Sequence, residues 1–489
     1  MKLRYSMHWV CAAGAALLVA ACGGGGGGDS PAPEVSAADR IEPFDPSLGK
    51  AAKAAAFPLR TAGRAPQATP VRLGPLAATA LQPLQKKAAS IPGSGMRQQI
   101  GLAREVSATA TSSGLRGQLQ WSPTDRGTQR AAIRFAAEGA QGVRLGLLVR
   151  SLPAGTTLRF YAQSGDAEFE VSGQEVLGTL ARNLQAGDTD DAARTYWSPD
   201  FGGAETTLEL ELPASADLDQ LDIAVPTLSH FFVSPERAAQ NSLTKVGEAA
   251  TCNIDVSCRP EYSSESRSVA RMIFVDNGST FVCTGTLLND AQSSATPYFL
   301  SANHCVSTQT AASSVTTDWF YRSAACNTTE VNAGARRLNG GATLLYAQEA
   351  TDTSFMRLNA APPAGVVFAG SYFGAVAVGA GMAGIHHPQG DLQKLSEGAV
   401  KQFNNCTFET CQISTPQDGR FLAVGWNAGT TEGGSSGSSL FLPIGSKRYV
   451  AGQLLGGAAS CQNPSSYDYY GRYDLAFQVA LKNWLKPAP

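Results

Sequence analysis

Short stretches in which apolar and polar residues alternate recur through two parts of this chain. In the first part, residues 101–235, the alternating runs cover residues 118–121, 131–135, 143–149, 157–162, 167–171, 206–212 and 221–225. Alternation with a period of two is typical of strands that have one buried face, and polar turns separate these runs. The pattern predicts a β-sandwich-like domain, which we interpret as a pro-domain or an accessory binding module.

The second part, residues 246–489, has the same texture and ends in one helical pattern at 475–485. A segment of this size can build two packed six-stranded antiparallel barrels with a C-terminal helix. The chain is therefore predicted to be all-β, with a sandwich-like domain that precedes a two-barrel domain.

The first 22 residues have the features of a signal peptide. Lys2 and Arg4 give a positive start, and the apolar stretch at 10–21 is too short to be a membrane helix. Residues 18–22 resemble a bacterial lipobox, which implies that Cys22 is acylated and that Gly23 favours sorting to the outer membrane. We expect an exported protein, anchored in the outer membrane or at the cell surface, or released after processing. The alternative is an ordinary secreted protein in which Cys22 has no role.

Two segments lack the strand pattern. Residues 23–100 are rich in Ala, Gly, Pro and Ser, cannot bury enough apolar surface to fold alone, and are predicted to be a flexible tether. Residues 236–245 are predicted to be a linker, and Lys245 is a candidate processing site.

Charge and cysteines narrow the function classes. The formal net charge of −2 gives no reason to expect nucleic acid as a partner. Eight cysteines lie beyond residue 250, and in an oxidising compartment an even set indicates disulfides. A zinc site is the competing interpretation, but no Cys-x-x-Cys pair is present. Asp188, Asp190 and Asp191 fit no calcium motif and are interpreted as a solvated acidic turn.

A serine in a glycine-rich segment is the first candidate for chemistry. Ser436 lies between Gly434 and Gly437, whose small size permits a tight turn that aims the backbone N–H groups of Gly434 and Ser436 at one point. Such a turn could present a nucleophile beside an oxyanion hole. Alone, the segment fits a flexible Gly/Ser loop equally well.

A histidine and an aspartate complete the candidate set. His304 ends a strand-like run beside Cys305, so it could be held rigidly at a cleft; His386 and His387, before Pro388, are interpreted as structural. Asp352 directly precedes a strand-like run and could orient the imidazole, while Asp318, inside a strand-like run, is its competitor. The order His, Asp, Ser is that of the chymotrypsin fold, so the cleft is expected between the two barrels.

Several further motifs together resemble the bacterial lysyl endopeptidases, trypsin-like serine proteases that cut after lysine. The motifs are TCNIDVSC at 251–258, IHHP at 385–388, TEGGSSGS at 431–438, GQL at 452–454 and DYYGR at 468–472. The resemblance spans residues 247–485 and implies a serine endopeptidase with the triad His304, Asp352 and Ser436, no metal or organic cofactor, and an N-terminal propeptide.

The resemblance also implies a disulfide pattern. It pairs Cys252 with Cys461, Cys258 with Cys326, and Cys283 with Cys305. Cys406 and Cys411 match nothing in the family, and we pair them by elimination.

Specificity follows from the same resemblance. The position that carries the specificity acid of trypsin is Thr430 here, whereas Asp468 matches the acid of the lysyl endopeptidases. A buried carboxylate favours a cationic side chain, so substrates with Lys, or else Arg, are expected. Leu455 stands where the family has a histidine that stacks on a tryptophan, here Trp426, which puts the family's rate and pH profile in doubt.

Activation is expected to differ from that of classical zymogens. Those enzymes pair a new N-terminal amine with an Asp immediately before the nucleophile, and that residue is Ser435 here. We therefore expect a monomeric zymogen in which loss of the N-terminal half unblocks the cleft. The rival interpretation is a surface lipoprotein that acts as a binding module and carries a vestigial protease domain.

Overall fold

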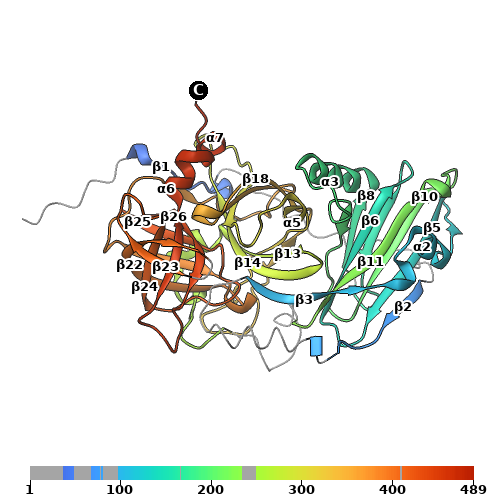
Figure 1. The fold of residues 1–489 in the computed structure, drawn as a ribbon, viewed down its shortest axis with the longest axis horizontal. Coiled ribbons are helices and arrows are strands. Elements are labelled where there is room, and N and C mark those ends of the chain that lie inside the picture. Colours follow the sequence, from blue (N-terminus) through green and yellow to red (C-terminus); the bar gives the residue numbers. More distant parts are fainter. Residues whose placement is uncertain are drawn as a thin grey trace, which may run out of the picture.

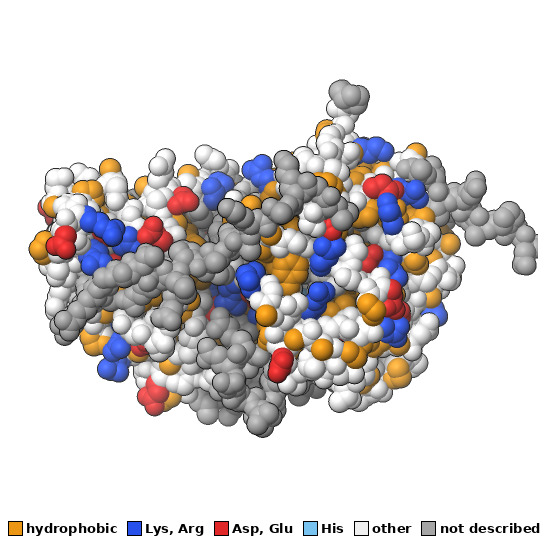
Figure 2. Space-filling model, turned by 180° about the vertical axis from the view of Figure 1, so that it is seen from behind, with side chains coloured by type: hydrophobic (Ala, Val, Ile, Leu, Met, Phe, Trp, Pro, Cys, Tyr) orange, Lys and Arg blue, Asp and Glu red, His pale blue; other side chains and the backbone are white. Residues whose placement is uncertain are grey.

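The computed structural model describes residues 37–48, 68–77, 79–80, 97–165, 167–233, 249–407 and 410–488. Figure 1 shows an N-terminal β-domain, in blue and green, lying beside a larger yellow-to-red unit. On the opposite face, Lys and Arg side chains are interspersed with Asp and Glu side chains over both halves (Figure 2), in keeping with the small net charge. Cys22, Lys245 and the linker at 236–245 lie outside the described residues.

The N-terminal domain is built from two β-sheets. One contains β2 (Thr69–Leu73), β4 (Ser122–Pro123), β5 (Thr128–Ala137), β7 (Thr157–Tyr161), β8 (Glu168–Ser172) and β10 (Glu205–Pro213). The other contains β3 (Gln98–Glu105), β6 (Gly142–Ser151), β9 (Thr195–Trp197) and β11 (Asp222–Phe231). A core that includes Phe135, Leu145 and Leu208 draws on both sheets, so their apolar faces pack together as the sequence pattern predicts.

One local prediction in this domain is wrong, and one helix was not predicted. Residues 118–121 were expected to form a strand, but Gln118 is the last residue of helix α2 (Ser112–Gln118), and the other three residues come directly after the helix. Helix α3 (Gly173–Gln185) was not predicted, although Ser172 and Glu175 form a capping box at its start. Residues 119–121 belong to no helix or strand, and the segment that forms α3 lies between two of the predicted alternating runs.

The predicted tether at 23–100 is in part ordered structure. Strand β1 (Arg40–Ile41) pairs with β20 (Gly370–Tyr372) of the C-terminal unit, and Phe44 packs on Phe368. Further along, β2 pairs with β5, and Val71 joins the sandwich core. Isolated apolar side chains are enough to order these segments because the folded domains supply the apolar surfaces on which they pack. The composition of the segment alone does not reveal those surfaces. We call residues 37–48 the strap.

The first barrel of the C-terminal unit is an open half-barrel. Its strands are β13 (Val269–Asp276), β14 (Ser279–Leu288), β15 (Tyr298–Ala302), β16 (Thr316–Trp319), β17 (Arg336–Leu338), β18 (Ala342–Gln348) and β19 (Thr353–Leu358). They follow the order β17-β16-β13-β14-β15-β19-β18. Helix α5 (Gln309–Ser313) lies against β18 and β13.

The second barrel is closed. Its wall is formed by β21 (Gly381–His386), β22 (Lys394–Cys406), β24 (Phe421–Ala428), β27 (Tyr467–Arg472), β26 (Lys447–Gly457) and β25 (Ser439–Ile444), each paired with the next and β25 paired again with β21. Shorter strands β12 (Ile254–Asp255), β20 (Gly370–Tyr372) and β23 (Cys411–Ser414) attach to this sheet. The C-terminal helix runs through α6 (Tyr473–Ala476), a π-helical turn at Phe477–Leu481 and α7 (Lys482–Leu485). The all-β, two-barrel prediction is confirmed.

Two features tie the molecule together. Strand β3 of the N-terminal domain pairs with β14, so one sheet runs from the sandwich into the half-barrel. Four disulfides join Cys252 to Cys461, Cys258 to Cys326, Cys283 to Cys305 and Cys406 to Cys411. These are the four pairs expected from the sequence.

Candidate active site

Two neighbouring strands of the half-barrel bring His304 and Asp352 together. Strand β15 ends at Ala302, β19 begins at Thr353, and these two residues are partners in the antiparallel register. His304 and Asp352 therefore leave the same edge of the sheet. The ring Nδ1 of His304 lies 2.8 Å from one carboxylate oxygen of Asp352, and its backbone N–H donates to the other at 2.9 Å. The carboxylate is buried, so it fixes the orientation of the ring.

The disulfide between Cys283 and Cys305 anchors this histidine. It fastens the residue after His304 to β14. The two sulfurs and the histidine also form a group with the spacing of metal ligands, but a disulfide sulfur is not a thiolate and does not fit a metal ion. Here the cysteines position the imidazole.

Ser436 lies on the turn between β24 and β25, which glycines allow to sit against the half-barrel. A Cβ on Gly437, whose φ is +79°, would lie 2.6 Å from the carbonyl oxygen of Thr284 and 2.8 Å from the nitrogen of Ala302. The backbone N–H of Thr284 donates to the carbonyl of Ser436 at 2.8 Å. The turn is thus fixed beside the end of β15, two residues before His304.

The backbone around Ser436 also directs two N–H groups. The carbonyl of Gly433 accepts from the N–H of Gln389 at 2.6 Å, and the carbonyl of Ser435 accepts from the N–H of Ser438 at 3.0 Å. In a trans peptide the N–H points opposite to the carbonyl. The N–H groups of Gly434 and Ser436 therefore point away from these internal partners, in the manner of donors for an oxyanion.

The inner side of the same turn has polar partners that the sequence did not reveal. His386 is buried, and its Nδ1 lies 2.8 Å from the hydroxyl of Ser435. Burial lowers the pKa of His386 to about 3, so this ring is neutral and acts as a fixed hydrogen-bonding group. The structural interpretation of His386 fits this position, but its contact with the residue before Ser436 gives it a positioning role. The sequence did not reveal this role because it does not show that the IHHP motif lies next to the serine segment in the fold.

Glu432 connects this turn to the residues that follow the linker. Its carboxylate accepts from the backbone N–H of Ala250 and from the side chain of Asn253, both at 2.9 Å. Burial raises the pKa of Glu432. The start of the C-terminal unit is therefore tied to the nucleophile turn by an acid four residues before Ser436, while position 435 itself is uncharged.

Asp468 lies on β27 of the second barrel and is completely buried. One carboxylate oxygen accepts from the indole N–H of Trp426 and from the hydroxyl of Thr431, both at 2.7 Å. No hydrogen bond of good geometry reaches the other oxygen, although the backbone N–H groups of Ala459 and Thr431 lie near the carboxylate and favour its ionised form. Burial raises the pKa of Asp468 to about 7. A buried carboxylate is costly unless donors or a cation compensate its charge.

The competitor Asp318 is excluded from the triad by its surroundings. It is buried between two guanidinium groups, with Arg271 at 2.7 Å and Arg337 at 2.7 Å. Burial alone would raise the pKa of Asp318, but these two arginines hold that pKa well below its usual range. Asp318 joins strands β13, β16 and β17 of the half-barrel through these two arginines.

A cavity of about 640 Å³ opens beside Asp352. Its lining includes Leu455, Glu349, Arg420 and Cys406 of the hairpin closed by the disulfide to Cys411. Leu455 thus faces the cleft at the position where the family histidine is expected. Trp426 packs edge-to-face against Tyr470 and donates its N–H to Asp468.

An all-β two-barrel fold with a histidine–carboxylate pair beside a glycine-framed serine defines a serine endopeptidase of the chymotrypsin fold. Two family descriptions match the chain: lysyl endopeptidase, N-terminal domain, over residues 72–232, and lysyl endopeptidase, C-terminal domain, over residues 246–471. A lysyl endopeptidase of Pseudomonas aeruginosa is 32% identical over 400 residues, which cover 78% of this chain and 80% of that protein. The chain belongs to the lysyl endopeptidase family.

Similar solved structures include other proteases. The Rv3671c protease from M. tuberculosis in its active form covers 51% of this chain and 94% of its own, with 15% identity and a TM-score of 0.31. The MamO protease domain from Magnetospirillum magneticum covers 45% of this chain and 98% of its own, with 11% identity and a TM-score of 0.32. Within the part of the chain that the structure describes, no helix has both the length and the apolar character needed to span a membrane.

Proposed function

We propose that this enzyme hydrolyses peptide bonds on the carboxyl side of basic residues, with Lys preferred, through His304, Asp352 and Ser436. The observation that carries the proposed specificity is the completely buried carboxylate of Asp468, which has one oxygen without a well-aligned donor. The ammonium of a substrate lysine supplies the missing donor and neutralises the charge. A leucine side chain can do neither.

The proposed reaction follows from the positions of the polar groups. Neutral His304 takes the proton of the Ser436 hydroxyl as that oxygen attacks the scissile carbonyl. Asp352 holds the ring with its Nδ1–H towards the carboxylate and stabilises the imidazolium that forms. The N–H groups of Gly434 and Ser436 bind the oxyanion, and the imidazolium then protonates the leaving amine.

Matched lysyl, arginyl and leucyl esters test this proposal. We expect the processed enzyme to prefer the lysyl ester and Ser436→Ala to be inactive on all three. A preference for the leucyl ester would overturn the role of Asp468, and full activity of Ser436→Ala would overturn the triad. Activity on none of the esters would favour the alternative of a binding module with a vestigial protease domain.

We also propose that the protein is exported as a monomeric zymogen and is lipid-anchored through Cys22. The support is the sequence of residues 1–22 and the four disulfides, which suit an oxidising compartment. Palmitate labelling of the wild type but not of Cys22→Ser is the expected result. Equal labelling of both proteins contradicts the anchor.

A further inference from the structure

One edge of β14 carries the N-terminal domain and the nucleophile turn side by side. While β13 pairs along the opposite edge, this edge receives β3 at Thr280–Val282, the carbonyl of Ser436 at Thr284, and β15 at Thr286–Leu288. A strand rises about 3.4 Å per residue, so Val282 lies about 7 Å along the strand from Thr284. Strand β3 therefore begins next to the proposed nucleophile.

The contacts that hold β3 on this edge are specific. Arg97, at the start of β3, donates to Asp276 at 2.8 Å, and its guanidinium lies 4.0 Å from the ring centre of Phe281. Ile100 packs with Val282 in a small core shared by the two domains. The backbone pairs Gly101 with Thr280 and Gln98 with Val282. The edge of β14 is thus covered by main-chain pairing, an ion pair and apolar contact together.

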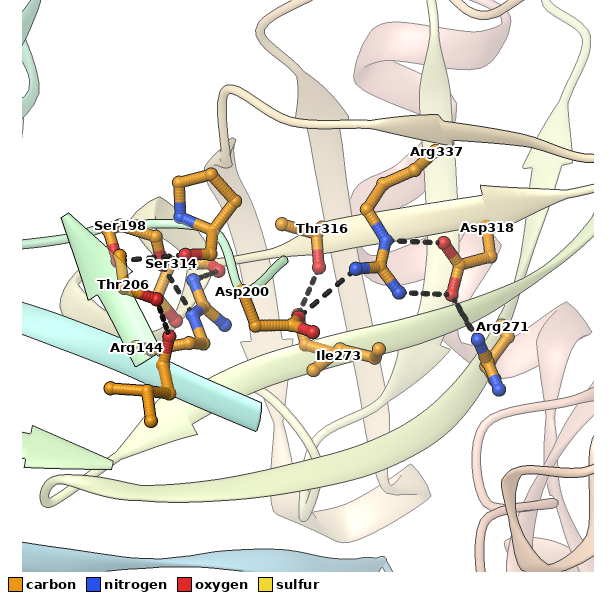
Figure 3. A network of polar contacts seen from close by, with 12 residues as sticks. Arg144, Ser198, Asp200, Thr206, Arg271, Ile273, Ser314, Thr316, Asp318 and Arg337 are labelled. Atoms are coloured by element: carbon orange, nitrogen blue, oxygen red, sulfur yellow. Dashed lines mark hydrogen bonds and ion pairs between the residues drawn. The ribbon is translucent and has the colours of Figure 1, made fainter. Parts of the chain in front are cut away.

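A second set of contacts fixes the N-terminal domain against the half-barrel. Figure 3 shows Asp200 of the N-terminal domain bound to Arg337, which in turn contacts Asp318. Arg144, also buried, donates to the carbonyl of Ser314 at 2.8 Å. These contacts place buried charged groups across the interface, so the N-terminal domain has one defined position on the half-barrel.

The same interface between the N-terminal domain and the half-barrel extends to the segment that follows His304. Asp188 accepts from the hydroxyl of Thr310 at 2.6 Å, and the side chain of Asn183 accepts from Ser313 at 2.7 Å. Thr310 and Ser313 belong to α5, which begins five residues after His304. The acidic turn expected to be solvated therefore contacts the half-barrel through Asp188.

We propose that β3 occupies the place that the leaving-group side of an extended substrate takes in the processed enzyme. This inference rests on the proposed function. If Asp468, on the second barrel, binds the residue before the scissile bond, the residues after the bond run towards the half-barrel, where the edge of β14 lies. A bare strand edge binds an extended peptide by main-chain hydrogen bonds. The uncut chain is therefore latent towards polypeptides, while its His304, Asp352 and Ser436 stay assembled.

The test compares two substrates on the uncut chain and on the processed enzyme. One is a lysyl ester with a small alcohol leaving group, and the other is a fluorogenic peptide with four residues after the lysine. We expect similar ester hydrolysis by both forms, and peptide hydrolysis that is roughly 100-fold lower for the uncut chain if β3 leaves the edge about 1% of the time. Electrophoresis before and after each assay verifies that the chain stays uncut.

A charge reversal tests the role of β3 itself. Arg97→Glu in the uncut chain places two like charges together and should raise peptide hydrolysis several-fold without changing ester hydrolysis. Adding Asp276→Arg to the same chain should restore latency by re-forming the pair in reverse. Arg116→Glu, which breaks an exposed pair with Asp219 inside the N-terminal domain, is the matched control and should change neither rate.

The outcomes separate this inference from the proposed function. Equal peptide hydrolysis by the uncut and processed forms would overturn the inference, and so would an uncut chain that is inactive on the ester as well. The inference would also be overturned if peptide hydrolysis by the uncut chain stays equally low in the wild type, in Arg97→Glu and in the double variant with Asp276→Arg. If the processed enzyme hydrolyses neither substrate, the proposed function itself fails.

Discussion

The carboxylate of Asp352 binds His304 twice, accepting from the backbone N–H with one oxygen and contacting the ring Nδ1 with the other. Asp352 has a φ of +48°, in the left-handed region that is uncommon for residues other than glycine. The chain adopts this conformation directly between a short helical turn and β19. The double contact fixes both the position and the tautomer of the imidazole.

Replacing Asp352 should therefore reduce the chemical step while the fold is kept. We expect Asp352→Asn to lower kcat by roughly 10⁴-fold, because the amide favours the wrong tautomer of the ring. KM for a lysyl ester should change little. Steady-state kinetics on the processed enzyme measures both, and a kcat within tenfold of the wild type would contradict the triad.

The control is the other buried aspartate of the half-barrel. Asp318→Asn leaves Arg271 and Arg337 without their shared counter-charge. Breaking a buried pair in this way costs about 3–5 kcal/mol of unfolding free energy. We expect a lowered midpoint in urea with kcat nearly unchanged, the reverse of the pattern for Asp352→Asn.

Substitution of Asp468 should abolish the preference for lysine. Removing the buried carboxylate that pairs with a substrate ammonium costs about 3–5 kcal/mol, or roughly 10²- to 4 × 10³-fold in kcat/KM for lysyl over leucyl esters. Asp468→Asn tests this loss of preference. Asp474→Asn is a suitable control, because Asp474 is an acid of the same region that forms an ion pair with Arg472. Retained lysyl preference in Asp468→Asn would place the specificity elsewhere.

The raised pKa of Asp468 predicts a pH dependence of substrate binding. With a pKa of about 7 in the free enzyme, the carboxyl is protonated below pH 7 and ionised above it. Only the ionised form attracts a substrate ammonium, so KM for lysyl esters should rise as pH falls below 7. KM for leucyl esters should stay flat, and Asp468→Asn should remove the difference between the two profiles.

His386 predicts a loss of stability in acid. Its folded pKa of about 3 lies below the value near 6.5 of an exposed histidine, so the unfolded chain binds a proton that the folded chain does not. Its contribution is therefore fully present above pH 6.5 and is lost between pH 6.5 and 3, at up to about 1.4 kcal/mol per pH unit. Urea midpoints of the wild type and His386→Asn, measured across this range, should converge as pH falls. Parallel curves would contradict the assignment.

Much of the fold was predictable because local rules and tertiary packing agree. Strands such as β5 and β10 alternate, three disulfides followed from the resemblance, and the pair Cys406–Cys411 followed by elimination. The triad candidates stand at strand ends and in a tight turn, where each signal alone is weak, and their order along the chain together with the resembling motifs selected them. The contact of His386 with Ser435 and the role of Glu432 were not found, since both depend on partners distant in the chain, and α3 was missed because its capping box was not recognised.

The strap has a consequence for how the two halves come apart. Residues 37–48 contact the C-terminal unit through Phe44 and through Asp45, which pairs with Arg267, while β3 contacts it separately at β14. A single cut between residues 233 and 249 would turn the N-terminal half into a bivalent ligand of the C-terminal unit. Binding of the strap would then raise the effective concentration of β3 at β14, and binding of β3 would do the same for the strap. A second cut between the strap and β3 would leave two weak monovalent ligands, so release of the enzyme would depend on the number of cuts as well as on their position.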